Sequence, residues 1–326
     1  MRAEGVPRFA RRGVLGVEEA IVQRATESLK LDPPNRCLMR RLLVFTVALA
    51  ISSEGAAQVA KPLQQHAVEI LSGGLQLKGF LWKPDGPGPF PAVVFNHGRS
   101  DTAQQYSLQL ELTLEHLAQI LGPVFVRHGF VFLYPFRRGE GPSAAQGHFI
   151  GELLQREEAA KGIEARRRLQ VVLMTTDHLQ DALAALSFLK SLPYVDAGRV
   201  AVAGHSFGGQ LTLLEGSREG AARAAVIFGA AAASWDGSPE LRDRLIESVR
   251  GLAMPVMLIQ AANDYSLSPI IAMDAELSRL SKPHVRKIYP AFGDTQSHGH
   301  NFLYFDIARW EQDVFAFLDA NVTLQN

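Results

Sequence analysis

A serine between two glycines is the residue in this sequence best suited to chemistry. It lies in the segment Gly204-His205-Ser206-Phe207-Gly208. The apolar run before it, 199–204, predicts a buried strand, and the run after it, 207–216, predicts a helix. A tight strand-to-helix turn would expose the Ser206 hydroxyl at the carboxyl edge of a sheet, and small glycines would avoid clashes with the neighbouring elements. The Phe207 amide would then lie at a helix N-terminus, where negative charge is favoured. The segment therefore predicts a nucleophile elbow.

A serine hydroxyl is a weak nucleophile, and it needs a base within hydrogen-bond reach and a carboxylate that orients the base. The elements that must position these groups alternate along the chain from about residue 60. Short apolar runs predict strands at 66–71, 75–84, 92–98, 130–135, 199–204, 224–229, 255–260 and 284–290. Gly73-Gly74 predicts a hairpin between the first two, and helical stretches follow most of the others. This alternation favours an α/β fold with a mostly parallel sheet covered by helices on both faces.

One segment interrupts that alternation. Residues 144–176 separate the turn after the fourth strand from the amphipathic helix predicted at 178–192. We interpret them as a helical insertion, either a lid or rim over a pocket or a solvated surface helix. The basic run Arg166-Arg167-Arg168 lies in this segment near several glutamates, and we interpret it as a solvated helix face.

Composition limits the function classes. The 326 residues are 47% hydrophobic, and 33 basic residues balance 33 acidic ones. A formal net charge of zero gives no electrostatic footprint for nucleic acid. The single cysteine, Cys37, excludes an internal disulfide and makes a Cys-based zinc site or a thiol nucleophile untenable. We expect no cofactor and no metal.

The N-terminus has the pattern of an export signal. Met39 is followed by Arg40 and Arg41, then by an apolar run of about ten residues and by small residues. We predict a signal peptide at 39–57, with 1–38 an upstream extension from a mis-assigned start, and a catalytic domain at 58–326. This implies a periplasmic or secreted protein with no stable membrane insertion after removal of the signal. The alternative is a buried helix in a cytoplasmic protein.

Five segments, in this order, resemble the α/β-hydrolase superfamily, and within it the dienelactone hydrolase and prolyl-oligopeptidase-like serine hydrolases. The resemblance covers roughly residues 65–320. It implies the α/β-hydrolase fold, a mostly parallel central sheet covered by helices on both faces, here with the helical insertion after strand 4. The segments are FNHGRS (95–100), PFRRGEGPS (135–143), VDAGRVAVAGHSFGG (195–209), MPVMLIQAANDYSLSP (254–269) and HGHNF (298–302).

The resemblance also implies which groups assist Ser206. In this fold the acid and then the histidine follow the nucleophile along the chain. The acid should come just after the strand at 255–260, which points to Asp264, with Asp236 and Asp274 as rivals. The family's histidine precedes the final helix, where His298 and His300 both lie. We choose His300, because Phe302 follows it at the family's spacing, although Asn301 stands where glycine is usual.

An oxyanion hole requires two backbone N–H groups, and the resemblance points to those of Phe207 and Arg99. We expect His97 and His205 to be structural, and we read the RRGEGPS segment as a structural turn near the site.

The resulting expectation is a serine hydrolase of the carboxylesterase or dienelactone hydrolase type, acting on a small-molecule acyl substrate through an acyl-enzyme. Acyl transfer or peptide cleavage on the same residues, and a non-catalytic ligand-binding protein on this fold, are the alternatives. Acyl size and oligomeric state stay open.

Overall fold

The computed structural model describes residues 64–107, 109–218 and 220–323. The predicted extension at 1–38 and signal peptide at 39–57 lie outside the described residues, as do the first residues of the predicted catalytic domain.

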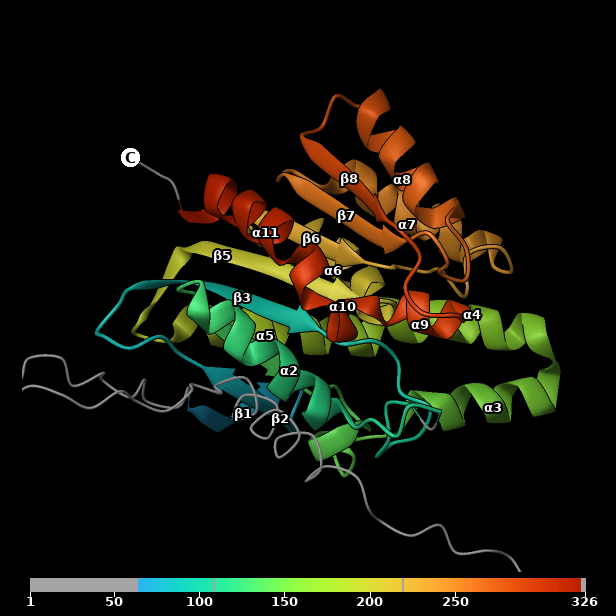
Figure 1. Cartoon of the computed structure of the whole chain (residues 1–326). Coiled ribbons are helices and arrows are strands. Elements are labelled where there is room, and N and C mark those ends of the chain that lie inside the picture. Colours follow the sequence, from blue (N-terminus) through green and yellow to red (C-terminus); the bar gives the residue numbers. More distant parts are fainter. Residues whose placement is uncertain (1–63, 108, 219, 324–326) are drawn as a thin grey trace, which may run out of the picture. The chain divides into compact units, whose positions relative to one another are not determined.

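An eight-stranded sheet forms the centre of the described region (Figure 1), in the order β1-β2-β4-β3-β5-β6-β7-β8. From β4 to β8 all neighbouring strands are parallel, while β1 and β2 form an antiparallel hairpin that pairs with β4. The predicted mostly parallel α/β sheet is therefore confirmed. The strands are β1 Gln65–Ser72, β2 Leu75–Trp82, β3 Phe90–Asn96, β4 Val131–Pro135, β5 Val195–His205, β6 Ala224–Phe228, β7 Val256–Ala261 and β8 His284–Tyr289.

The hairpin between β1 and β2 turns at the two glycines that predicted it. Gly73 and Gly74 have φ values of +52° and +87°, a conformation that glycine adopts with little strain. Two consecutive residues with positive φ match the twist of an antiparallel hairpin. Ser72 consequently pairs with Leu75, which sets the register of the whole hairpin.

Helices cover both faces of the sheet, and the strands divide their side chains between two cores. Along β3, Ala92 and Val94 enter one core while Val93 and Phe95 enter the other, and all four side chains are fully buried. Burial on both faces explains the continuous apolar run. The helices are α2 Leu114–Arg127, α3 Ile150–Lys161, α4 Ile163–Leu173, α5 Leu179–Ser191, α6 Phe207–Gly216, α7 Pro239–Gly251, α8 Ser268–Arg279, α9 Gln296–His300, α10 Phe302–Phe305 and α11 Ile307–Leu318.

The segment after β4 contains a pair of helices joined at Gly162. α3 and α4 pack on each other, and α4 also contacts α7 (Figure 1). A π-helical turn, Met174–His178, connects α4 to α5. Among the described residues, no helix combines the length and apolar character needed to cross a membrane.

Candidate active site

Ser206 lies in a strained turn between β5 and α6. Its backbone has φ 55° and ψ −117°, a combination that residues with a side chain rarely adopt. The Ser206 amide donates to the carbonyl of Phe228 at 2.9 Å, and the Ser206 carbonyl accepts from the Gln210 amide at 3.1 Å, so both sides of the turn are anchored. Strain held in place by surrounding structure is typical of functional sites.

The two glycines of the turn are needed because other backbone passes very close to them. A Cβ on Gly208 would overlap the carbonyl of Asn96 at the end of β3. A Cβ on Gly204 would collide with the Thr212 hydroxyl and with the Gly208 carbonyl. This is the steric reason that the sequence pattern suggested: the strand and the helix meet too tightly for any larger residue.

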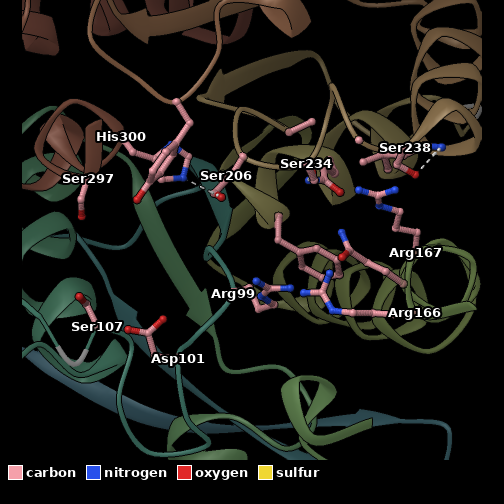
Figure 2. Close-up of a pocket in the computed structure, with 18 of the residues that line it drawn as sticks. Arg99, Asp101, Ser107, Arg166, Arg167, Ser206, Ser234, Ser238, Ser297 and His300 are labelled. Atoms are coloured by element: carbon pink, nitrogen blue, oxygen red, sulfur yellow. Dashed lines mark hydrogen bonds between the residues drawn. The ribbon is translucent and has the colours of Figure 1, made fainter. Parts of the chain in front are cut away.

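A chain of two hydrogen bonds connects Ser206 to a buried carboxylate. His300 Nε2 lies 2.8 Å from Ser206 Oγ (Figure 2). On the other side of the ring, His300 Nδ1 lies 2.7 Å from Asp264 Oδ1. The carboxylate can only accept from Nδ1–H, so Nε2 is left as the acceptor for the serine hydroxyl. Ser206 comes from the β5–α6 turn, Asp264 from the loop after β7 and His300 from the end of α9.

The Asp264 carboxylate is itself held from two further directions. Oδ2 accepts from Gln260 Nε2 at 2.9 Å, and Oδ1 accepts from the Tyr265 amide at 2.6 Å. The side chain is 1% exposed and that of His300 is 8% exposed. The neighbouring Asn263 fixes the histidine-bearing loop, because its amide donates to the carbonyls of Phe292 and Thr295. Sequence analysis did not single out Asn263 or Gln260.

The rival residues lie elsewhere. His298 Nδ1 accepts from the Asp294 amide at 3.3 Å, within its own loop. Asp274 forms an ion pair with Arg286 at 2.8 Å. Asp236 is exposed, and its carbonyl accepts from Arg242. The structure therefore brings Asp264 and His300 to Ser206, and it does not bring these three there.

His205 packs against His300 and holds its backbone. Its Nε2 donates to the His300 carbonyl at 2.8 Å, and the two rings lie 4.6 Å apart. Burial, together with the charge that His300 can carry, lowers the pKa of His205 well below its usual value, so the ring stays neutral. The Tyr106 hydroxyl bridges this ring to Asn301, at 3.2 Å from His205 Nδ1 and 2.9 Å from Asn301 Oδ1.

The loop after β3, which carries Arg99, is held by a buried ion pair. The Arg137 guanidinium donates to the carbonyls of His97 and Gly98 at 2.5 and 2.9 Å. It also pairs with Glu140 at 2.9 Å, and the other Glu140 oxygen accepts from the Ser100 amide at 3.0 Å. Contacts on both sides of Arg99 thus fix the loop.

His97 belongs to the same loop assembly. Its Nδ1–H donates to the Gly98 carbonyl at 2.7 Å, and Nε2 accepts from the Arg137 amide at 3.3 Å. Burial and the Arg137 charge lower its pKa well below the usual value, so the ring is neutral. Phe207, the other residue considered for an oxyanion hole, is the first residue of α6, where amides have no partner within the helix.

A cavity of about 370 Å³ opens at Ser206 and His300. Figure 2 shows polar side chains around it, with Arg99 and Asp101 from the loop after β3 and Ser234 and Ser238 from the segment before α7. In the described part of the chain, no group of His, Cys, Asp and Glu side chains is arranged to hold a metal ion.

The helix α4 supplies part of the pocket wall, through Arg166, Arg167 and Gln170 among others. The interpretation of Arg166 to Arg168 as a solvated face missed the fact that two of the three line the pocket. Arg166 and Arg167 are 26% and 34% exposed and line the pocket, while Arg168 is exposed and does not. Helical periodicity shows which residues share a face, but it does not show which distant element that face meets.

Known structures share this fold. An acylaminoacyl peptidase from Pyrococcus horikoshii is 17% identical, with a TM-score of 0.57 over 82% of this chain and 43% of its own. An esterase from Pyrococcus furiosus is 14% identical, with a TM-score of 0.55 over 80% and 92%. A dienelactone hydrolase from Anabaena variabilis is 19% identical, with a TM-score of 0.52 over 80% and 99%. This chain thus spans less than half of the peptidase but nearly all of the dienelactone hydrolase.

A comparison with curated proteins found no match. A family description fits most of the chain, however. Residues 77–306 match the dienelactone hydrolase family, a span that runs from β2 to α10 and includes Ser206, Asp264 and His300. This chain belongs to the dienelactone hydrolase family.

Proposed function

We propose that the protein is a serine hydrolase of the carboxylesterase type, which cleaves esters through an acyl-enzyme. The observation that carries this proposal is the unbroken hydrogen-bond chain from Asp264 through His300 to Ser206, at 2.7 and 2.8 Å, beside an open cavity. Family membership supports hydrolysis in general, and the arrangement of these three side chains supports the covalent route.

In the first half of the reaction, Ser206 Oγ attacks the acyl carbon while His300 Nε2 takes the hydroxyl proton. Asp264 stabilises the imidazolium that forms and keeps its orientation. The carbonyl oxygen becomes an oxyanion, which we assign to the backbone amides of Arg99 and Phe207. Collapse breaks the ester C–O bond, and the leaving alcohol departs with the proton from His300. The acyl group remains bound to Ser206.

In the second half, a water molecule attacks the acyl carbon and gives its proton to His300. The acid product leaves, and the proton returns to Ser206 Oγ. A preorganised oxyanion site is usually the largest single contribution to catalysis in such reactions, with about 10²–10³ in turnover for each donor. The fixed loop around Arg99 and the helix N-terminus at Phe207 support this assignment.

The test combines labelling with turnover. We expect a fluorophosphonate probe to label the folded protein, and p-nitrophenyl acetate to give a burst of p-nitrophenol followed by steady turnover. Ser206→Ala should abolish both and leave the fold intact by circular dichroism. A Ser206→Ala variant with near wild-type turnover would overturn the assignment. An unlabelled, inactive wild-type protein would instead favour a ligand-binding role.

Two further measurements separate the alternatives on the same residues. Added alcohol that diverts the acyl group into a new ester, in preference to water, would favour acyl transfer. Cleavage of a peptide p-nitroanilide faster than of the matched p-nitrophenyl ester would favour a peptidase. We expect hydrolysis of the ester to dominate in both comparisons.

A further inference from the structure

The pocket beside Ser206 is lined by three arginines, and we infer from this that it takes an anionic substrate. Specifically, we propose that Arg99, Arg166 and Arg167 bind a carboxylate or phosphate group of the ester that Ser206 cleaves. The inference deepens the proposed function, because it concerns the substrate of the same site. It is argued from the charges, the contacts of each arginine and the character of the remaining wall.

The charges around the cavity are unequal. Among the described residues that line it, Arg99, Arg166 and Arg167 are cationic, and Asp101 is the one carboxylate. The three arginines come from separate places in the sequence, Arg99 from the loop after β3 and the other two from α4. Figure 2 shows Arg99 and Arg166 side by side on the wall of the pocket. Like charges gathered in this way repel each other unless an anion lies between them.

The charge of Arg99 is countered only at longer range, by Glu140 and Asp101. Arg99 is an exposed residue at the pocket, although protein surrounds much of its guanidinium. It forms no ion pair within 4.0 Å among the described residues. Burial, followed by the charge of Arg166, lowers the pKa of Arg99 below its usual value. The opposite charge of a bound anion would stabilise the guanidinium and offset both effects.

Arg166 and Arg167 each keep donors free for a ligand. Arg166 uses Nε to contact Glu158 at 3.0 Å, and Arg167 uses Nη1 to contact Glu164 at 2.5 Å. These glutamates are 47% and 62% exposed, so the pairs are solvent-screened and weak. Each guanidinium has five N–H donors, and the planar fork matches both oxygens of a carboxylate or phosphate.

The rest of the wall also suits a polar ligand. Gln210 is only 3% exposed and lines the cavity, and its Oε1 has no hydrogen-bond partner among the described residues. Ser234 and Ser238 also line the cavity (Figure 2), and Gln210 Nε2 donates to Ser234 Oγ at 3.4 Å. An aliphatic acyl chain in this place would leave buried polar groups without partners, which is costly. A hydroxyl or amide N–H of a polar substrate would satisfy Gln210 Oε1, and the Ser234 hydroxyl can donate to an anionic oxygen.

The position of Ser206 beside this cluster sets the substrate class. One part of the ester reaches Ser206 and His300, and its anionic part lies against the arginines within the same cavity of about 370 Å³. A cavity of this size accommodates a small diacid monoester or a substituted aryl ester. The anion can belong to the acyl side or to the alcohol side, and the experiment therefore includes both.

The experiment compares matched anionic and neutral esters. One pair is mono-p-nitrophenyl adipate and its methyl ester; the other is 3-acetoxybenzoate and its methyl ester. For the wild type, we expect kcat/KM to favour the anionic member at least tenfold in one pair, and the preference to fall as salt screens the charges. Measurements with 3-acetoxyphenyl phosphate then show which of the two anions is preferred.

Single substitutions identify the ligands, with a control from the same helix. Arg99→Gln, Arg166→Gln and Arg167→Gln should each lower the anionic-to-neutral ratio of kcat/KM by about tenfold, the size expected for one charge-assisted hydrogen bond. Arg168→Gln removes the same charge from an exposed position of α4 outside the pocket and should leave the ratio unchanged. Equal ratios in all four variants would overturn the proposal, as would a wild type that favours the neutral ester in both pairs.

A binding measurement keeps this inference separate from the proposed hydrolysis. In the Ser206→Ala protein, we expect calorimetry to show that the monoanilide of adipic acid binds at least tenfold more tightly than its methyl ester. Arg166→Gln in that background should remove the difference. If neither ester is hydrolysed but this difference is found, the proposed function fails and the anion site stands. If esters are hydrolysed without any anion preference and the anilide shows no preference in binding, the anion site fails and the proposed function stands.

Discussion

The ion pair between Arg137 and Glu140 should contribute far more to stability than an exposed pair of the same spacing. Both side chains are almost completely buried, at 2% and 0% exposed. Glu140→Gln would remove the negative charge and leave the Arg137 guanidinium buried without its counter-charge. Breaking one side of a buried pair in this way typically costs about 3–5 kcal/mol. We therefore expect the free energy of unfolding to fall by about that amount.

The chain contains a matched control. Arg244 and Glu247 are also an i,i+3 pair, at 2.7 Å, but their side chains are 35% and 67% exposed. Exposed pairs contribute about 0–1 kcal/mol, so Glu247→Gln should change stability by less than about 1 kcal/mol. Urea unfolding of the wild type and both variants, followed by tryptophan fluorescence, measures the two costs under the same conditions.

The same substitution should also reduce turnover, because Arg137 and Glu140 hold the loop on both sides of Arg99. If the Arg99 amide stabilises the oxyanion, its displacement should lower kcat by up to about 10²–10³ and change KM little. A kcat equal to that of Glu247→Gln would refute the positioning role. Unfolding free energies of the two variants within 1 kcal/mol of each other would refute the electrostatic argument.

Three other predictions concern single residues and the N-terminus. His300→Ala should lower kcat by about 10²–10⁴ and His298→Ala by less than tenfold; initial rates with p-nitrophenyl acetate test this, and the opposite ranking would assign the base to His298. Burial raises the pKa of Glu215 from 4.5 to about 8. Because the folded state then binds the extra proton, stability should fall as pH rises from about 4.5 to 8, by up to about 5 kcal/mol at about 1.36 kcal/mol per pH unit. Glu215→Gln should flatten that part of the stability curve in urea titrations, and an unchanged slope would contradict the assignment. N-terminal sequencing of the protein from its native host should find a start near Gln58, and a cytoplasmic form starting at Met1 would rule out the predicted signal peptide.

The fold could be predicted from the sequence alone, because each buried strand and each tight turn has its own short sequence pattern and these patterns recur along the chain. Each buried strand is a short apolar run, as in β3, where both faces are covered and no polar residue interrupts the pattern from Ala92 to Phe95. The tight turns could also be predicted from their glycines, since Gly73 and Gly74 adopt backbone conformations that other residues avoid. The Gly-x-Ser-x-Gly segment was informative for the same reason: its steric requirement is contained within five residues.

The tertiary structure decided the relations between distant residues. His298 and His300 are two positions apart, and spacing could not determine which of them reaches Ser206; the fold of α9 and the Asn263 contacts turn His300 toward it. The ion pair of Arg137 with Glu140 appeared in sequence only as a charged turn, because its burial depends on packing against the loop after β3.

The arginines of α4 show the same limit most clearly. Arg166, Arg167 and Arg168 are consecutive and chemically identical, and their glutamate neighbours indicated a solvated surface. Helix geometry spreads three consecutive residues around the axis by about 100° each, so they cannot all face one way. These arginines lie about forty residues before Ser206 in sequence, yet two of them line the same pocket. Which of the three line it depends on how α4 packs against the rest of the fold.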